Sequence, residues 1–497
     1  MGAMALAALV GRFFITTPLW LDEALSVNVA KLPIGDIGRA LRHDGHPPLY
    51  YWLLHGWISM FGDGTQAVRS LSAVISLLAL PLAYLMGRRL GGRHLAVMFA
   101  WVLAVSPFLL RYGSETRMYS LVIVEVMVGY LVVDTALQKI SWAPLLGVAV
   151  TTSALLWTHY WSLWLLVSVG LLMVIRVVQS RRHGPVDRPA LAVLGAMTIG
   201  LVGYLPWVPS MLYQAEHTGT PWAKTARPAG IVVTSVFDFS GGPYSEPQVG
   251  AFFSMVILVI GLLGAARAGE PWHLDLDFRT RRDARPIGAI IGTTVVVASI
   301  ATLVLRSGFA ARYASVYFPF VVLLVAFGFE RFLPGRLRTL ILSTFLVLTL
   351  LGLGFTFRQD RTQAGIAAER ITSARQADPL VVTCPDQLGP AVSRALGPDA
   401  DVVTYPALGS PALVDWVDYE RRNAATDPVA FADAVLERAG ERPIFLVFNT
   451  AYLTMEGKCE GVIARLGQSR PGRILLTNDA DAYYENMSVL EYPGAPS

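Results

Sequence analysis

Acidic and imidazole side chains stand in two short motifs near the start of the chain. Asp22 and Glu23 come directly after Trp20, and Asp44 and His46 precede a run of proline, leucine, tyrosine and tryptophan residues. Carboxylates and imidazoles most often take or give a proton during catalysis. A structural interpretation is also open, in which Asp22 begins a helix and Trp20 belongs to an aromatic belt. We favour a catalytic role for Asp22, because residues elsewhere in the chain suit the same chemistry.

Arginine and tyrosine residues form a second group, in two short stretches that we expect to be turns between apolar helices. Guanidinium groups match phosphate oxygens with two parallel hydrogen bonds, so they suit a lipid-linked phosphate at a membrane surface. Ion pairing within the first turn, or anchoring to lipid headgroups, is the structural alternative. The group consists of Arg111, Glu115, Arg117, Tyr119, Arg312 and Tyr313.

The composition places most of the chain in a membrane. Of the 497 residues, 54% are hydrophobic and only 15% are charged, and the mean hydropathy is +0.50. A soluble protein of this length would carry more polar surface. The net charge of +4 does not indicate nucleic-acid binding, because the basic residues are spread between apolar stretches. The richness in arginine and alanine fits a bacterial protein.

Apolar stretches long enough to cross a bilayer recur along residues 1–357. A spanning helix needs roughly 20 mainly apolar residues, or somewhat fewer where aromatic or basic anchors flank it. We therefore expect a polytopic α-helical membrane domain with about eleven transmembrane helices. The expected helices are 2–20, 66–87, 95–110, 118–137, 142–157, 161–176, 189–209, 249–266, 286–305, 313–329 and 339–357.

The loops between these helices alternate in charge. Loops on one side are basic, which identifies that side as cytoplasmic. The other side then holds a first outer loop, 21–65, a second long loop, 210–248, and the C-terminal segment. We expect a multi-pass protein of the bacterial inner (plasma) membrane whose site and C-terminal domain are extracytoplasmic. The basic residues are Arg88, Arg89, Arg93, Lys139, Arg181, Arg182, Arg188, Arg279, Arg281, Arg282, Arg285, Arg331, Arg336 and Arg338.

The first expected helix is unusual, because Arg12 lies near its middle. A charge at the centre of a bilayer costs at least roughly 2.5 to 3.5 kcal/mol. Either Arg12 faces an internal site, or the helix begins upstream of Met1. We favour the second interpretation.

The composition becomes that of a soluble domain over residues 358–497. Short apolar runs alternate there with amphipathic stretches, which predicts a small α/β domain. No glycine-rich phosphate-binding motif follows an expected strand, so we assign the domain no nucleotide. Cys384 and Cys459 both lie here, as one disulfide bridge or as two buried thiols. The expected strands are 380–383, 401–405, 443–448 and 473–477, and the expected helices are 428–438 and 457–466.

Four motifs in this order resemble the GT-C superfamily of membrane glycosyltransferases. The branch is the one related to protein O-mannosyltransferases and the lipid A aminoarabinose transferase. The motifs are Leu-Trp-Leu-Asp-Glu ending at Glu23, His-Pro-Pro-Leu-Tyr-Tyr from His46, Arg-Tyr-x-x-Glu-x-Arg-Met-Tyr from Arg111, and Arg-Tyr from Arg312. The resemblance covers residues 5–330 in motif order and hydropathy, and it implies the GT-C fold.

The resemblance also implies roles for individual residues. It makes Asp22 the catalytic base, with Glu23 as the second choice, and it places Asp44 and His46 in the lining of the site. The chain differs from the aminoarabinose transferase at Gly45, where that enzyme has glutamate, and at His46, where it has lysine. The second acid is therefore open, with Asp44 as the nearest substitute.

The implied reaction moves a sugar, mannose or a pentose such as arabinose, from a polyprenyl-phosphate donor to an acceptor hydroxyl. The acceptor would be a lipid, a polysaccharide or a protein. Asp22 would deprotonate this hydroxyl, a role worth roughly 10² to 10⁴ in rate, and one displacement would invert the anomeric carbon. The residues that we expect to bind the donor phosphate are Arg111, Arg117, Arg312 and Lys224. The lining of the site is completed by Tyr50, Glu115, Tyr119 and Tyr313.

We expect no required cofactor, because arginine can balance the charge of the leaving phosphate, although a divalent cation could bind at Asp22, Asp44, His43 and His46. The loop 210–248 suits a mobile lid, or is an ordinary long loop. The main alternative function is a transporter or flippase of a lipid-linked glycan. Transporters commonly show repeated halves with broken helices, and the sequence shows no such repeat. A noncatalytic envelope scaffold and a polymerase using a diphosphate carrier are further alternatives.

Overall fold

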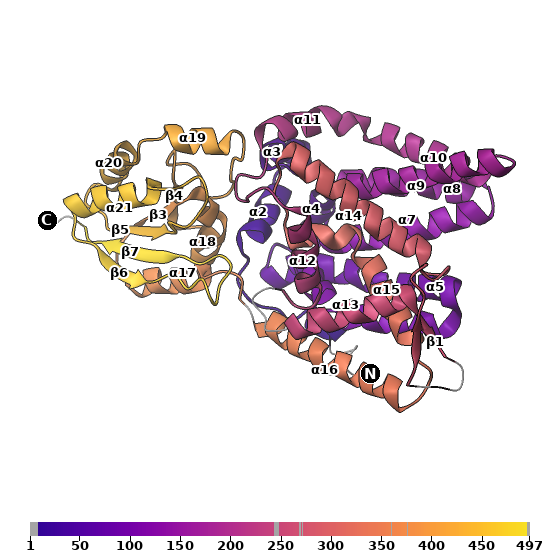
Figure 1. Ribbon diagram of the computed structural model, residues 1–497. Helices are drawn as coiled ribbons and strands as arrows, with labels where there is room; N and C mark the ends of the chain where they lie inside the picture. The colour runs from indigo at the N-terminus through magenta and orange to yellow at the C-terminus, as the bar shows by residue number, and fades with distance from the viewer. Residues whose placement is uncertain are drawn as a thin grey trace.

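Helices make up the first part of the chain and a mixed sheet organises the last part, so that the molecule consists of two adjoining units (Figure 1). The computed structural model describes residues 8–242, 248–267, 270, 272–358, 360–374 and 376–494. The helical unit ends with α16 (Arg336–Arg358). The C-terminal unit begins with α17 (Ala364–Ser373).

Three short helices occupy the segment expected as the first outer loop. They are α2 (Leu21–Ala30), α3 (Ile34–Asp44) and α4 (Leu49–Phe61). Helix α3 ends because Gly45 takes a left-handed conformation, with φ of 91°, which costs glycine little. Ser26, Val27 and Tyr51 are fully buried. The segment is therefore a packed part of the helical unit.

The remaining helices of this unit agree closely with the apolar stretches of the sequence. Among the described residues, six helical segments are long and apolar enough to cross a membrane, and four shorter apolar helices accompany them. The expected polytopic membrane fold is confirmed. The elements are α5 (Thr65–Ala104), α6 (Pro107–Gly113), α7 (Tyr119–Gln138), α8 (Trp142–Thr158), α9 (Ser162–His183), α10 (Arg188–Tyr204), η1 (Leu205–Trp207), α11 (Val208–His217), α12 (Pro228–Phe239), α13 (Gln248–Leu263), α14 (Arg285–Leu305), η2 (Ala311–Val316), α15 (Phe318–Glu330) and α16.

Several boundaries differ from the expectation. The stretch 95–110 ends in the separate helix α6, and 313–329 begins in the 3-10 helix η2 before α15. Residues 66–87 and 95–110 were expected as separate helices, and they meet in the kinked helix α5, where Gly91 and Gly92 leave helical geometry. The stretch 249–266 ends as a helix at Leu263, because the chain then forms a hairpin of β1 (Gly264–Ala266) and β2 (Leu274–Leu276).

The first expected helix, 2–20, is wrong in its second half. Residues 1–7 lie outside the described part, a helical turn ends at Gly11, and the chain is not helical from there to Trp20. Arg12 is buried and donates to Ser76 Oγ at 2.9 Å and to the Ala104 carbonyl at 3.2 Å. Both terminal nitrogens of the guanidinium thus bind inside the protein, which agrees with the interpretation that Arg12 faces the interior and not with the one favoured from the sequence.

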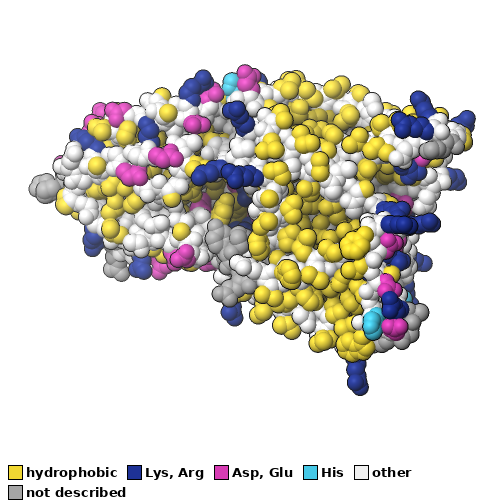
Figure 2. Space-filling view, in the orientation of Figure 1, with side chains coloured by type: hydrophobic (Ala, Val, Ile, Leu, Met, Phe, Trp, Pro, Cys, Tyr) yellow, Lys and Arg dark blue, Asp and Glu magenta, His cyan; other side chains and the backbone are white. Residues whose placement is uncertain are grey.

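The surface divides into an apolar zone and two charged ends. Hydrophobic side chains cover most of the visible face of the helical unit, while charged side chains gather on the C-terminal unit and at the opposite end (Figure 2). The turns that follow α7 and α9 lie at that opposite end (Figure 1), and they carry Lys139, Arg181 and Arg182. This distribution is that of a multi-pass membrane protein whose C-terminal unit lies on the side away from the basic turns.

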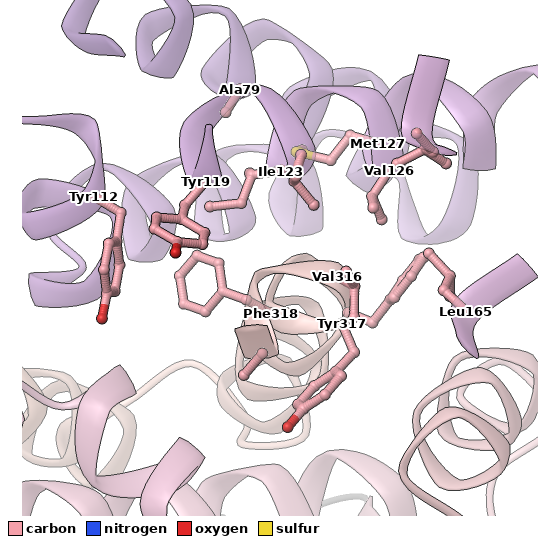
Figure 3. Close-up of a cluster of buried hydrophobic side chains, with 14 of the residues drawn as sticks. Ala79, Tyr112, Tyr119, Ile123, Val126, Met127, Leu165, Val316, Tyr317 and Phe318 are labelled. Carbon is pink, nitrogen blue, oxygen red and sulfur yellow. The ribbon is translucent and has the colours of Figure 1, made fainter. Parts of the chain in front are cut away.

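The core of the helical unit forms where α7 meets the segment η2–α15. Tyr119, Ile123 and Val126 point from α7 towards Val316 and Phe318 (Figure 3), and all of these side chains are buried. Close packing here fixes the position of η2 relative to α7, and η2 carries Arg312 and Tyr313. Core packing in the membrane therefore positions a candidate site residue.

The C-terminal unit is a five-stranded sheet in the order β4-β3-β5-β7-β6. Strand β3 pairs in parallel with β4 and β5, and β7 runs antiparallel to β5 and β6. Helices α20 and α21 cover one face, and α17 and α18 cover the other. The elements after α17 are β3 (Leu380–Cys384), η3 (Asp386–Leu388), α18 (Gly389–Leu396), β4 (Asp401–Thr404), α19 (Tyr419–Ala425), α20 (Pro428–Ala439), β5 (Ile444–Phe448), α21 (Lys458–Ser469), β6 (Arg473–Leu476) and β7 (Ser488–Tyr492).

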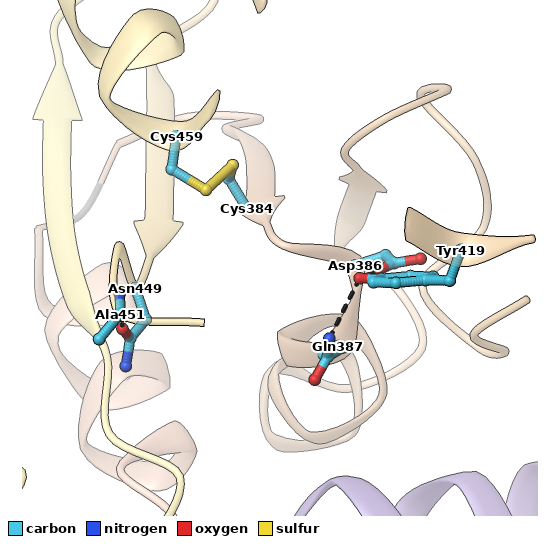
Figure 4. The surroundings of a disulfide bond; sticks show 7 residues. All are labelled: Cys384, Asp386, Gln387, Tyr419, Asn449, Ala451 and Cys459. Atoms are coloured by element: carbon cyan, nitrogen blue, oxygen red, sulfur yellow. Dashed lines mark hydrogen bonds between the residues drawn. A yellow bond between two sulfur atoms is a disulfide. The ribbon is translucent and has the colours of Figure 1, made fainter. Parts of the chain in front are cut away.

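All four expected strands and both expected helices of this unit are present, which confirms the predicted α/β fold. Strand β7 and the helices α17, α18 and α19 were not expected from the sequence. Of the two states left open for the cysteines, the structure has the disulfide bond between Cys384 and Cys459. The bond joins the end of β3 to the start of α21 (Figure 4).

Removal of the disulfide bond should loosen the C-terminal unit. The bond closes a loop of 75 residues in sequence separation, and such bonds contribute typically about 2 to 4 kcal/mol by restricting the unfolded chain. In the full-length Cys384→Ser/Cys459→Ser variant, hydrogen exchange of the slowest amides in β3 and α21 should become at least about tenfold faster. Unchanged exchange in these elements, with helical-unit amides as the internal control, would contradict this expectation.

Candidate active site

A cavity of about 660 Å³ lies between the helical unit and the C-terminal unit. Residues of both units line it. The helical unit contributes Trp20, Leu21, Asp22, Leu25, Asp44, Gly45, His46, Arg117, His159, Tyr160, Trp161, Thr218, Trp222, Arg312 and Tyr313, and the C-terminal unit contributes Gln387, Trp416, Asn449, Tyr452, Tyr484, Glu485 and Asn486, among others.

Asp22 and Arg312 form an ion pair in this cavity. Asp22 is the second residue of α2, and its Oδ2 lies 3.1 Å from Nη2 of Arg312. The two side chains are only 16% and 15% exposed. The guanidinium also lies near the rings of Trp20 and Trp222, at 5.4 and 5.8 Å from their centroids, which suits a partly desolvated cation.

The environment keeps Arg312 charged. Burial alone would lower the pKa of this guanidinium, but the negative charge of Asp22 and the neighbouring Tyr119 hold it well above its ordinary value. A cation that remains charged at every physiological pH is suited to an anionic ligand such as a phosphate.

Arg117 organises a second group of polar side chains. Its Nη1 donates to Ser26 Oγ at 3.1 Å and to the Tyr51 hydroxyl at 3.2 Å, and its Nη2 donates to His46 Nε2 at 2.8 Å. A guanidinium has no acceptor, so His46 Nε2 must accept and the ring proton lies on Nδ1. Nδ1 then donates to Asp44 Oδ2 at 2.7 Å. Arg117, His46 and Asp44 thus form one hydrogen-bonded chain at the cavity wall.

Asp44 ends this chain as an ionised acceptor. Burial pushes its pKa upwards, but the contact with His46 and the charge of Arg117 bring the pKa below its ordinary value. Asp44 is therefore occupied in orienting His46, and it accepts a further hydrogen bond from the Tyr51 hydroxyl at 3.3 Å.

Glu23 faces away from the cavity. Its carboxylate accepts two hydrogen bonds from Arg69, at 2.8 and 2.7 Å, and one from the Thr116 amide at 3.0 Å. The side chain is fully buried and does not line the cavity. Glu23, the second choice for the catalytic base, therefore suits a structural role, because fixed donors inside the helical unit hold its carboxylate.

Three further residues assigned to the site are held elsewhere. Arg111 pairs with Asp238 at 3.5 Å, and the Tyr50 hydroxyl shares a hydrogen bond of 2.8 Å with a serine in α5. Lys224 is exposed. None of the three lines the cavity, so the structure does not bring them to the ion pair of Asp22.

Glu115 and Tyr119 lie behind the cavity wall. Glu115 is buried in an ion pair with Arg361. Tyr119 is buried with its ring centroid 5.7 Å from that of His159, and within the described residues its hydroxyl has no hydrogen-bond partner. Tyr313 does line the cavity, where it stacks near His159 and Trp161 at 5.1 and 5.5 Å.

His159 is a cavity residue that was not expected from the sequence. It lies in the turn between α8 and α9, next to Tyr160 and Trp161. Burial lowers the pKa of His159 well below its ordinary value, and the neighbouring His46, Arg117 and Arg312 add to this effect. The imidazole is therefore neutral at physiological pH. The sequence feature that could have identified His159 is its position in an aromatic turn between two apolar helices.

The second outer loop, expected over 210–248, is partly helical. Helix α11 continues to His217, α12 follows, and residues 243–247 lie outside the described part. Thr218 and Trp222, between these helices, line the cavity. Asp22, Asp44, His43 and His46 were considered as ligands of a divalent cation. In the described ranges, neither these residues nor any other histidine, cysteine, aspartate or glutamate side chains form a group of three or more that could hold a metal ion.

The comparisons with known proteins concern the fold of the chain. Residues 45–209 match the family model of dolichyl-phosphate-mannose-protein mannosyltransferases. The whole chain superposes on ArnT from Cupriavidus metallidurans bound to undecaprenyl phosphate, with a TM-score of 0.62, 11% identity and coverage of 100% of this chain and 99% of ArnT. The apo state of the same protein gives a TM-score of 0.60 at 12% identity, with the same coverage. The chain has the GT-C fold.

The expected resemblance to the GT-C superfamily, in the branch of protein O-mannosyltransferases and ArnT, is thereby confirmed. An oligosaccharyltransferase from Archaeoglobus fulgidus also matches, with a TM-score of 0.47, 11% identity and coverage of 90% of this chain and 68% of that one. No curated protein sequence matches the chain. The match of the family model includes His46, Arg117 and His159, whereas Asp22 and Arg312 lie outside it.

The buried ion pair between Glu23 and Arg69 should be essential for stability. The side chains are 1% and 5% exposed, and loss of one partner of such a pair leaves an uncompensated charge, at about 3 to 5 kcal/mol. Arg69→Met should therefore lower the melting temperature of the protein in nanodiscs by several degrees. Lys31→Met is the control, because the Lys31–Asp63 pair is about half exposed and worth roughly 1 kcal/mol at most. Equal effects of the two substitutions would contradict this interpretation.

Proposed function

We propose that this protein is a polyprenyl-phosphate-sugar-dependent glycosyltransferase of the bacterial inner membrane. It would transfer mannose, or a pentose such as arabinose, to a hydroxyl of a cell-envelope lipid, polysaccharide or protein. The active site and the C-terminal unit would lie on the extracytoplasmic side, because the basic turns lie at the opposite end. The observation that carries this proposal is the ion pair of Asp22 and Arg312 inside a cavity between membrane helices and a soluble domain.

The cations of the cavity suit the donor. A sugar on a polyprenyl phosphate already has a good leaving group, so the protein must hold the phosphate and balance its charge. Arg312 and Arg117 both line the cavity, and each presents a fork that matches phosphate oxygens. ArnT, which shares the fold, binds undecaprenyl phosphate, and a lipid of the same class in this cavity would meet both arginines.

Asp22 suits the role of general base. Its carboxylate is held by Arg312. A donor phosphate would compete for Arg312, so its arrival would leave Asp22 available for the acceptor hydroxyl. The hydroxyl proton then moves to Asp22, the acceptor oxygen bonds to the anomeric carbon, and the bond from that carbon to the phosphate oxygen breaks. One displacement of this kind inverts the anomeric carbon.

The remaining cavity residues position these groups. His46 is fixed between Arg117 and Asp44, so it keeps the Arg117 fork in place. Neutral His159 and the ring of Tyr313 form an aromatic wall next to Arg312, which lowers the local dielectric and strengthens charge interactions. Arginine can balance the leaving phosphate in this scheme without a metal ion, so we propose that no divalent cation is required.

Asp22→Asn should abolish transfer and leave donor binding intact. Loss of a general base lowers the rate by roughly 10² to 10⁴, whereas the amide keeps the size of the side chain. The assay is transfer and hydrolysis of a panel of polyprenyl-phosphate sugars by purified protein in nanodiscs, with donor binding measured in parallel. Asp36→Asn, a carboxylate in α3 at an exposed ion pair, is the matched control and should behave as the wild type.

Two outcomes would contradict the proposal. Undiminished transfer in Asp22→Asn would exclude this residue as the base. Binding of a lipid-linked glycan without turnover of any donor, in the wild type as in the variant, would indicate a transporter or flippase.

A further inference from the structure

The two walls of the cavity differ in their charged side chains. The wall from the helical unit contains both arginines, Arg117 and Arg312, together with the carboxylates of Asp22 and Asp44. The described residues with which the C-terminal unit lines the cavity include no lysine or arginine, and one of them, Glu485, is acidic. An anionic ligand would therefore favour the helical wall, and the C-terminal wall is suited to a ligand without negative charge.

The polar residues of the C-terminal wall follow from the topology of the sheet. Strands β3 and β5 are parallel, so their carboxyl ends lie at one edge, where open α/β sheets generally bind ligands. Gln387 follows β3 and Asn449 follows β5, and both line the cavity. The disulfide bond of Cys384 and Cys459 lies directly beside this edge (Figure 4). A cross-linked sheet edge thus places two amide side chains in the cavity wall, where Gln387 Nε2 donates to the Tyr419 hydroxyl at 3.2 Å and Asn449 Nδ2 donates to the Asn486 carbonyl at 2.8 Å.

Glu485 connects this edge to α2, the helix that carries Asp22. Its Oε1 accepts a hydrogen bond of 3.1 Å from the backbone amide of Leu21, the residue before Asp22. The side chain is 2% exposed, and its Oε2 has no hydrogen-bond partner in the described part of the protein. A buried polar atom without a partner is costly. Because Glu485 lies in the cavity wall, a polar group of a bound ligand would supply the missing hydrogen bond to Oε2.

Aromatic residues lie beside Glu485 in the wall. Trp20 contacts Tyr484 edge to face, with 5.4 Å between the ring centroids, and its buried indole nitrogen also has no partner within the described residues. Tyr452 and Trp416 lie in the same wall. Flat apolar surfaces next to amide and carboxyl groups match the alternating CH and OH faces of a sugar ring.

We propose that the carboxyl edge of β3 and β5, together with Glu485 and Trp20, binds an uncharged sugar residue of the acceptor. This site would present one hydroxyl of that residue to Asp22. The assignment rests on the proposed function for the identity of the reaction, and it adds the chemical class of the acceptor, a neutral glycan or glycolipid headgroup in place of an anionic one.

The protonation of Glu485 agrees with this role. Burial raises the pKa of this carboxyl to about 8, and the charges of Asp22 and Glu23 on α2 raise it too, while contacts with Thr362 and the Leu21 amide act in the opposite direction. Tyr452 also faces Glu485. At pH 7 the carboxyl is mostly protonated, so Oε2 can donate a hydrogen bond to a sugar oxygen. As the pH rises through about 8, the donor is lost and a negative charge appears beside Asp22.

The test measures binding of soluble glycosides to the full-length protein in nanodiscs, by saturation-transfer-difference NMR. The probes are neutral methyl glycosides of hexoses and pentoses, and the 6-phosphates of the same hexosides. Glu485→Gln retains a donor at this position and should bind the preferred neutral glycoside within about threefold of the wild type, whereas Glu485→Leu should bind it at least about tenfold more weakly. Glu456→Leu, at an exposed residue of the same unit, is the control and should bind as the wild type.

The pH profile separates this role from a merely structural one. Wild-type affinity for the neutral glycoside should fall as the pH rises through about 8, and the affinity of Glu485→Gln should not. Binding of none of the neutral glycosides, preference for the phosphorylated ones, or equal affinity of the wild type and Glu485→Leu would overturn the proposal. A Glu485→Leu protein that fails to fold leaves the Glu485→Gln pH profile as the deciding result.

Failure of this inference is distinguishable from failure of the proposed function. Glycoside binding is measured without a donor, so it does not depend on turnover. Sugar transfer that depends on Asp22, combined with preference for phosphorylated glycosides, would leave the function intact and remove the neutral acceptor. Neutral-glycoside binding that depends on Glu485, without sugar transfer, would support the sugar-binding site and contradict the proposed function.

Discussion

The position of α2 depends on one buried interaction, the ion pair between Glu23 and Arg69. Successive residues of a helix point about 100° apart, so a carboxylate fixed in the interior at residue 23 directs the side chain at residue 22 elsewhere. Asp22 consequently faces the cavity and Arg312. The amide of Leu21 is bound by Glu485 of the C-terminal unit. Three consecutive residues therefore connect the membrane core, the cavity and the soluble domain.

This arrangement gives the cavity two unlike halves. The half from the membrane helices holds both arginines of the cavity, Arg117 and Arg312, beside two carboxylates and several aromatic rings. The half from the sheet carries amides, aromatic rings and one buried carboxyl. Donor and acceptor of a sugar transfer differ in the same way, since the donor carries a phosphate and the acceptor offers a hydroxyl. The contact of the two halves at α2 places the proposed base between them.

Much of the membrane fold could be predicted from the sequence, since long apolar stretches between basic turns have few other solutions. The prediction of the first helix was wrong in its second half, where Arg12 binds Ser76 and Ala104 inside the protein. A hydropathy pattern does not reveal such partners. Strand β7 was missed because its five residues mix polar and apolar side chains.

Each of the four motifs supplies at least one residue to the cavity lining, among them Asp22, His46, Arg117 and Arg312. Membership of a motif did not predict which of its residues face the cavity. The turn that supplies Arg117 also contains Arg111 and Glu115, but it bends so that these two contact Asp238 and Arg361. Glu485 could not be found from the sequence, because it meets Leu21 across a separation of 464 residues. Contacts of this kind depend on the docking of the two units, which no local pattern encodes.

The central claim is that Asp22 deprotonates the acceptor for one direct displacement at the anomeric carbon. The anomeric configuration of the transferred sugar tests it most directly. NMR of the product formed from a polyprenyl-phosphate sugar of known configuration should show complete inversion. Retention of configuration would require a covalent sugar intermediate on the protein, and it would contradict the assignment of Asp22 as a base acting in a single step.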